Sequence, residues 1–203
     1  MSSDDGSPEI PYLPMLQIPG RHDLRRQPLV TPRLWLMPLE TTDAAELWTA
    51  VESCRSYLEP WLPWVPFQTA PEASHQYAEA SMHDWDFGRA LRFVIRERPA
   101  RRLLGVVSIE NLQHLHLSGE LGYWLRRDAA GRGLMTEAAD AVVQWTFRTL
   151  GAHRIRVAAA TNNHASLGVI RRLNFRFEGV SRQSELVAGR WLDHAVFGRL
   201  DTD

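Results

Sequence analysis

The sequence predicts an α+β fold, with helices packed on the faces of a sheet. Three observations predict it. Strand-like segments follow one another in the first half of the body, and strands and helices then alternate toward the C-terminus. Residues 132–150 place apolar side chains on one face at the helical period. Finally, 203 residues that are 44% hydrophobic suffice for one domain with its own core.

The elements can be placed in chain order. Residues 1–28 hold five of the twelve prolines, so they predict an extended arm ahead of a domain at 29–203. The apolar residues of this arm favour an arm that lies against the body. The expected strands are residues 34–39, 91–96, 103–110, 120–126, 153–159, 175–180 and 190–200.

The expected helices have recognisable ends. They cover residues 42–53, 71–87, 132–150 and 163–173. Thr42 and Asp43 suit a helix start, Pro71 suits a first turn, and Gly151 and Asn174 suit left-handed caps. Between the first two helices, residues 57–67 mix three prolines with aromatic residues, which predicts a rigid loop over an apolar surface.

Charge and cysteine content exclude several classes of protein. The chain has 23 basic and 24 acidic residues, and a balance this even argues against non-specific nucleic-acid binding. No apolar run approaches the ~20 residues of a membrane span, and residues 1–6 lack the features of a secretory signal. Cys54 is the single cysteine, and no Cys/His cluster has zinc spacing. We expect a soluble, cytoplasmic protein with no metal, nucleic-acid or membrane partner.

Residues 121–137 are the most informative stretch. They run from a strand through a turn with Gly131 and Gly133 into the long helix. Such a turn directs backbone N–H groups outward at the positive end of a helix, where an anion can bind. A simple strand-to-helix connector would have a similar local sequence, so the turn alone does not decide between the two.

Further motifs accompany this turn in a fixed order. They are Thr31–Leu34, Trp61–Trp64, Glu120–Trp124, Asn163–Ser166, Glu178–Gly179 and Gly189–Asp193. With them the chain resembles the GNAT superfamily of acyl-CoA N-acyltransferases over about residues 29–200. It is most similar to the branch of bacterial enzymes that acetylate the N-termini of ribosomal proteins. The resemblance implies a twisted, mostly antiparallel sheet that splays open between its fourth and fifth strands, where acetyl-CoA inserts.

The resemblance also implies which residues bind acetyl-CoA. The expected set is Gly131, Arg132, Gly133, Leu134, Met135 and Thr136 in the turn, with Asn163 on the pantetheine arm. The family's turn has Gln or Arg where this chain has Ala130, and a small residue where it has Met135. Main-chain donors hold the phosphates, so we expect weakened but real binding. Arg132 is equally compatible with a solvated loop charge, and Asn163 with a simple helix cap.

Acyl transfer requires a base for the amine and a proton donor for the departing thiolate. Many relatives use a tyrosine as the donor, but its position here is Ile170. By resemblance the donor is instead Ser166, which could equally bond only local backbone. Two carboxylates are candidates for the base. Glu120 lies at the start of the cleft strand and Glu185 is expected in the loop between the last two strands; we favour Glu120.

The acceptor amine is the least constrained part of the prediction. Trp61, Trp64 and Tyr123 could form its wall, although aromatic residues at such positions are often core. The expected reaction is acetylation of a protein N-terminus, such as that of a ribosomal protein, by an enzyme that could form a homodimer. A small amine such as a polyamine, amino acid or antibiotic is the alternative acceptor. A non-catalytic CoA-binding module ranks behind both.

Overall fold

The computed structural model describes residues 14–203, and residues 1–13 of the predicted arm lie outside this part. Its core element is an eight-stranded sheet in the order β1-β2-β3-β4-β5-β6-β8-β7. The strands are β1 (Leu29–Val30), β2 (Leu34–Pro38), β3 (Leu91–Glu97), β4 (Leu103–Gln113), β5 (Ser118–Leu125), β6 (Arg154–Ala160), β7 (Arg176–Val187) and β8 (Arg190–Leu200). All neighbours are antiparallel except β5 and β6. The α+β prediction is confirmed.

Six α-helices and several short helical turns accompany the sheet in the described residues. The helices are α1 (Arg21–Arg26), α2 (Ala44–Glu52), α3 (Arg55–Leu58), α4 (Pro71–Asp86), α5 (Leu134–Trp145) and α6 (His164–Arg172). The last turn of α5 continues as a π-helix, Thr146–Leu150, and ends on Gly151 with φ 71°. Asn174 has φ 58°, so both predicted left-handed caps are confirmed. No helix of residues 14–203 is long and apolar enough to cross a membrane.

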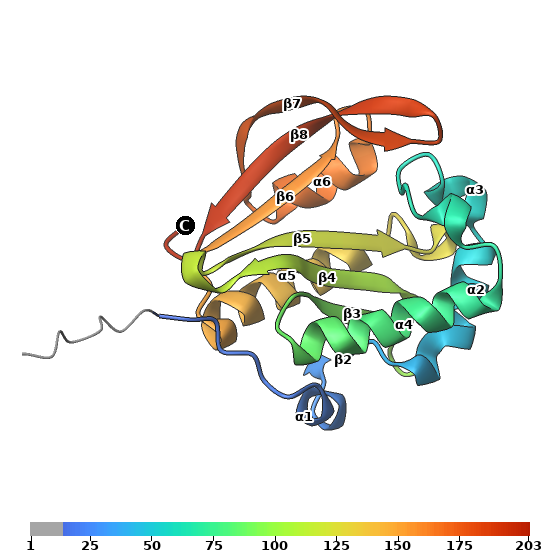
Figure 1. Ribbon diagram of the computed structural model, residues 1–203, viewed down its shortest axis with the longest axis horizontal. Helices are drawn as coiled ribbons and strands as arrows, with labels where there is room; N and C mark the ends of the chain where they lie inside the picture. The colour runs from blue at the N-terminus through green and yellow to red at the C-terminus, as the bar shows by residue number, and fades with distance from the viewer. Residues whose placement is uncertain (1–13) are drawn as a thin grey trace, which may run out of the picture.

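Helices cover both faces of the sheet, and each face has its own core (Figure 1). Side chains alternate between faces along each strand. On β5, Leu121 and Leu125 join the core beneath α5 and α6, whereas Trp124 joins the core beneath α2 and α4. The same alternation on the other strands means that a residue's position in its strand decides which core or cavity wall it reaches.

The N-terminal arm is docked in its described part, as expected, but it is not extended throughout. Between Pro19 and Pro28 a proline-free stretch forms α1, because nothing there blocks helical hydrogen bonds. Leu16 and Leu24 are buried in the core. Arg25 donates to the buried carboxylate of Asp43 at 2.7 Å. These contacts hold the arm against β2 and α4.

Two other segments differ from the sequence predictions. Residues 57–67 were expected to lack regular structure, but their N-terminal end completes α3 and Val65–Phe67 forms a 3-10 turn. As expected, the segment covers an apolar surface, and Leu58 and Val65 are buried there. Strand β7 runs to Val187, well beyond the predicted end at residue 180, and a tight turn at Ala188 and Gly189 joins it to β8.

The sheet splits between β5 and β6, which are the fourth and fifth of the predicted strands. Their parallel pairing covers only Ser118–Arg154, Gly119–Ile155 and Glu120–Arg156. Beyond these pairs the two strands diverge, and β6, β8 and β7 continue as a separate wing (Figure 1). The split predicted from the family resemblance is confirmed, and it opens a large cavity between the two strands.

Candidate active site

A cavity of about 1330 Å³ occupies the gap where β5 and β6 separate. Its walls come from the split strands, the turn before α5, the start of α6, the segment around α3 and the β7–β8 hairpin. The residues with chemical groups that matter below are Tyr57, Trp61, Trp64, Arg92, Glu110, Glu120, Tyr123, Arg156, Asn163, Ser166, Arg172, Glu185 and His194. Segments between Tyr57 and His194 therefore meet at one place.

The gap in the sheet connects two chemically different sides. Tyr123 packs against the core beneath α5 and α6, and Ser166 belongs to α6. Glu120 precedes Tyr123 by three residues on β5. Because successive side chains of a strand alternate between faces, Glu120 faces the opposite side, beneath α2 and α4. We call the α5/α6 side the donor side and the α2/α4 side the acceptor side. A group placed in the gap can be reached from both.

The glycine turn forms one end of the donor side. Gly131 and Gly133 have φ angles of 76° and 75°, in the left-handed region that favours glycine. The N–H of Glu137 donates to Gly133 O at 3.1 Å. Within residues 14–203, the N–H groups from Gly131 to Thr136 have no such acceptor. Unused donors at a helix N-terminus, with open space where a Cβ at Gly131 would stand, fit a bound phosphate.

Some side chains around the glycine turn reach the cavity, and others do not. Arg172 lines it and donates to Thr136 Oγ1 at 3.1 Å, which places a cation beside the free amides. Arg132 does not line it, because its guanidinium pairs with Glu97 at 3.1 Å. Met135 lines the cavity but is 7% exposed, and it belongs to the α5/α6 core.

Ser166 lies beside the aromatic side chain that crosses the gap. Its Oγ is 2.9 Å from the hydroxyl of Tyr123. Burial raises the pKa of Tyr123 to about 12, so this phenol stays protonated at neutral pH. The N–H of Ser166 donates to Asn163 Oδ1 at 3.1 Å, which confirms Asn163 as a helix cap. The capped turn fixes the direction in which the Ser166 hydroxyl points.

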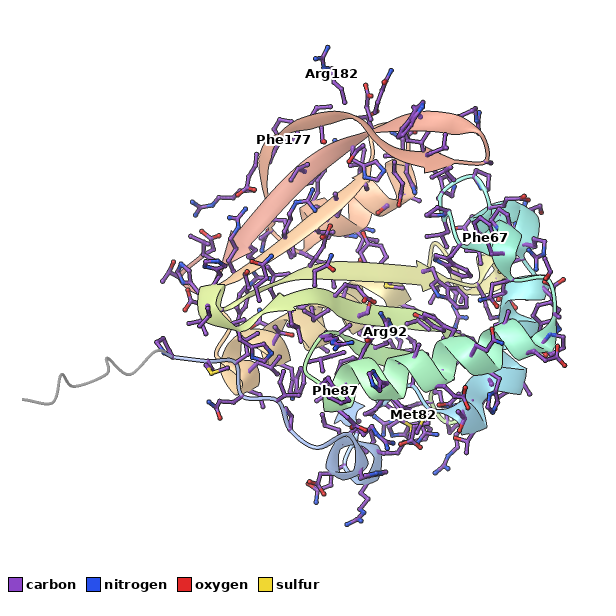
Figure 2. All side chains as sticks on the ribbon, in the orientation of Figure 1. Phe67, Met82, Phe87, Arg92, Phe177 and Arg182 are labelled. Carbon is purple, nitrogen blue, oxygen red and sulfur yellow. The ribbon has the colours of Figure 1, made fainter. Side chains whose placement is uncertain are left out.

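The acceptor side carries three carboxylate–cation pairs across the surface of the sheet. Arg92 donates to both oxygens of Glu110 at 2.8 and 2.7 Å, and it lies between the sheet and α4 (Figure 2). Arg156 donates to Glu120 at the last rung of the β5–β6 pairing, and Asn111 donates to the other oxygen of Glu120. The third pair is Glu185 with His194, whose Oε2 and Nε2 are 3.4 Å apart.

The prediction that Glu185 lies in a loop is wrong. It lies within β7 and opposes Leu192 across an irregular register, which turns its carboxylate toward the cavity. Burial raises the pKa of Glu185, and the negative charge of Glu120 across the gap raises it further, while His194 opposes both. Glu120 and Glu185, the two candidate bases, therefore face the same cavity from opposite sides of the split.

The predicted acceptor wall also reaches the cavity. Trp61 and Trp64 line it, and the ring of Trp64 lies 6.1 Å from that of Trp124. Both come from the segment after α3, on the acceptor side. Tyr123, predicted with them, instead contacts the donor side through Ser166. No group of three His, Cys, Asp or Glu side chains within residues 14–203 is arranged to hold a metal ion.

Sequence reasoning missed six of the site residues: Tyr57, Arg92, Glu110, Arg156, Arg172 and His194. Arg172 lies six residues after Ser166 on α6, and this spacing does not place the two side chains on one face of the helix, so its sequence position did not single it out. Arg156 and His194 gave no local signal, because their importance comes from carboxylates on other strands.

A split sheet with free helix-terminal amides on one side and paired carboxylates on the other defines an acyl-CoA-dependent transferase. The chain belongs to the acetyltransferase (GNAT) domain family, whose model matches residues 33–176. It is an acetyl-CoA-dependent N-acetyltransferase.

Relatives of known sequence or structure agree with this assignment. The chain is 28% identical over 176 residues to the probable N-acetyltransferase YjcK of Bacillus subtilis, covering 84% of this chain and 95% of that one. It is 26% identical over 178 residues to the [ribosomal protein uS5]-alanine N-acetyltransferase of Escherichia coli, covering 87% and 92%. The structure of Mycobacterium smegmatis RimJ in complex with CoA-disulfide superimposes with a TM-score of 0.78 at 26% identity, covering 82% and 81%.

Proposed function

We propose that this acetyltransferase modifies the N-terminal α-amine of a protein, and that a ribosomal protein is the substrate class. The observation that carries the proposal is the two-sided gap, with groups for an acyl donor on one side and carboxylates for a cationic amine on the other. The choice of a protein acceptor is supported by relatives named for the alanine of ribosomal protein uS5 and for a ribosomal-protein serine.

The donor side would hold acetyl-CoA through its backbone. The amides from Gly131 to Thr136 would bind the pyrophosphate, and Arg172 would add a positive charge beside them. Arg132 is left out of this set because it pairs with Glu97. The loss of a charged side chain at Ala130 is thereby offset by a cation from α6.

The hydroxyls of Ser166 and Tyr123 would serve the leaving group. In the reaction the amine nitrogen bonds to the thioester carbonyl carbon, the C–S bond breaks, and the sulfur takes a proton from Ser166 Oγ. Tyr123, which stays protonated and lies 2.9 Å away, can replace that proton through its own hydroxyl. The products are an N-acetylated chain and CoA. The ammonium loses two protons in all: one restores the hydroxyls that protonated the sulfur, and the other passes to solvent.

The acceptor side suits an ammonium group at the end of a longer chain. An α-ammonium with a pKa of ~8 is mostly charged at neutral pH. Arginines pair with Glu110 and Glu120, so Glu185 is the carboxylate of this surface that would attract the ammonium. The aromatic rings of Trp61 and Trp64 would pack against the first side chains of the acceptor. These groups bind the end of a peptide without needing to enclose it.

Transfer of labelled acetyl groups to matched acceptors tests the proposal. The acceptors are N-terminal peptides of uS5 beginning with alanine or serine, the same peptides with blocked α-amines, and the small amines spermidine and methionine sulfoximine. We expect label in the free peptides, little in the blocked ones, and none without the parent protein. Label confined to spermidine or methionine sulfoximine would replace the protein acceptor with a small-molecule acceptor.

A further inference from the structure

Of the three carboxylate pairs on the acceptor side, only one has a basic partner that can accept as well as donate a proton. Arg92 and Arg156 remain charged, because a guanidinium is not deprotonated in proteins. Glu110 and Glu120 are therefore held by permanent cations. The imidazole of His194 differs from a guanidinium because its second ring nitrogen can accept a proton, so the Glu185–His194 pair contains a basic partner able to act as a base.

Geometry separates the pairs as well. Both oxygens of Glu120 already accept hydrogen bonds, from Arg156 and from Asn111, and both oxygens of Glu110 accept from Arg92. Neither carboxylate has an oxygen left without a donor. His194, by contrast, lines the cavity with 15% of its side chain exposed.

We propose that His194 is the group that takes the proton from the acceptor ammonium, and that Glu185 positions its ring. The neutral imidazole would direct Nε2–H to Glu185 Oε2 and keep the lone pair of Nδ1 for the substrate. The proton passes from R–NH3+ to Nδ1, which leaves the neutral amine R–NH2 and an imidazolium. Glu185 stabilises that charge, and the imidazolium later returns its proton to solvent. This inference rests on the proposed function and assigns the base within it.

The charged groups that surround His194 favour this arrangement. Glu185 contacts it from β7, while Glu120 faces the pair from β5 and Arg156 faces it from β6. Burial and the charge of Glu120 raise the pKa of Glu185. The imidazolium formed during the reaction lies among two carboxylates and one guanidinium, so its positive charge is compensated where it appears.

The pH dependence of kcat/KM distinguishes a base from a structural residue. The parent, His194→Gln, Glu185→Gln and the exposed control His116→Gln are assayed with the alanine peptide and labelled acetyl-CoA between pH 5.5 and 9.5, a span of about two units on each side of a neutral base. We expect His194→Gln to lose about 100-fold at pH 7 and to recover as pH rises, because the free amine then forms without the base. The control should match the parent at every pH.

Glu185→Gln decides which member of the pair takes the proton. Removing the carboxylate next to an imidazole disfavours its protonated form, so the acidic limb of the profile should move to lower pH, with a smaller loss than in His194→Gln. A larger loss in Glu185→Gln, or a His194→Gln profile parallel to that of the parent, would overturn the inference while the proposed function stands. A parent that acetylates neither peptides nor small amines would overturn the proposed function itself.

Discussion

The two sides of the split sheet present different kinds of chemical groups to the cavity. The donor side uses main-chain N–H groups and neutral hydroxyls, which the glycine turn and the Asn163 cap hold in place. The acceptor side uses ion pairs between strands, which depend on the register of β3 with β4, β5 with β6, and β7 with β8. The comparison teaches that the backbone groups of the donor side are set by local sequence, whereas the ion pairs of the acceptor side exist only in the assembled sheet.

The largest expected effect concerns the glycine turn of the donor side. Gly133→Val places a β-branched residue at φ 75°, which distorts the amides that face the cavity. We expect the affinity for acetyl-CoA to fall by at least about 100-fold. Isothermal titration calorimetry with CoA measures this directly.

Gly151→Val is the matched control for that variant. Gly151 has φ 71°, similar to Gly133, and nothing lies within 4 Å of an added Cβ, but it caps the far end of α5. The strain should lower the free energy of unfolding by a similar amount, about 1–3 kcal/mol, in both variants. Equal CoA affinities in the two variants would show that the phosphate site lies elsewhere.

The second-largest expected effect distinguishes the chemical step from acetyl-CoA binding on the donor side. Ser166→Ala removes a hydroxyl but keeps the N–H that donates to Asn163, so the helix cap survives. Turnover should fall by about 100-fold, and the Kd for acetyl-CoA should change by less than about twofold. Steady-state kinetics with CoA titrations check both numbers. Unchanged turnover would remove Ser166 from the reaction.

A smaller effect is expected from the carboxylate that the sequence favoured as base. Glu120→Gln weakens the pairing with Arg156 at the last rung before the split. Because the substitution alters the positions of these two side chains and not proton transfer, kcat/KM should fall less than about tenfold and by a similar factor at every pH. A pH profile of the variant provides the measurement. Loss of the acidic limb in Glu120→Gln would restore Glu120 as the base.

The smallest effect on activity is expected from a buried ion cluster far from the gap. Burial alone would raise the pKa of Asp43, but hydrogen bonds from Arg25 and Arg96 hold it below its usual value. Asp43 therefore stabilises the fold above about pH 4, and this stabilisation disappears as the pH falls through its lowered pKa.

Arg25→Gln tests that cluster. It should lower the free energy of unfolding by about 1–3 kcal/mol at pH 7 and move the acid-induced loss to higher pH. Denaturant titrations at pH 7 and below measure both effects, while kcat/KM should stay at the parent value. A change in the kinetic pH profile would show that the arm and the cavity are coupled.

The sequence predicted the donor side better than the acceptor side for a physical reason. Gly131, Gly133 and Asn163 act through local backbone geometry, which short motifs encode. The helical stretch inside the arm could also have been found, since the segment between Pro19 and Pro28 contains no proline. These features depend on neighbours within a few residues.

The acceptor side depends on contacts between residues that lie far apart in the sequence. Glu185 was placed in a loop because the predicted strand ended at residue 180, whereas β7 continues to Val187 through a register shift between Ser181 and Glu185. His194 becomes notable only once Glu185 lies opposite it. The pairing of Glu120 with Arg156 likewise follows from the parallel contact of β5 and β6, which are separated by a helix in sequence.

A crystal structure of the protein with CoA tests the central claim that the two sides of the gap serve different substrates. The account predicts pyrophosphate oxygens within hydrogen-bonding distance of the amides from Gly131 to Thr136. It also predicts the sulfur in the gap beside Ser166 and Tyr123, with Glu185 and His194 left free on the other side. A CoA molecule lying against Arg92, Glu110 or His194 on the acceptor side would contradict it.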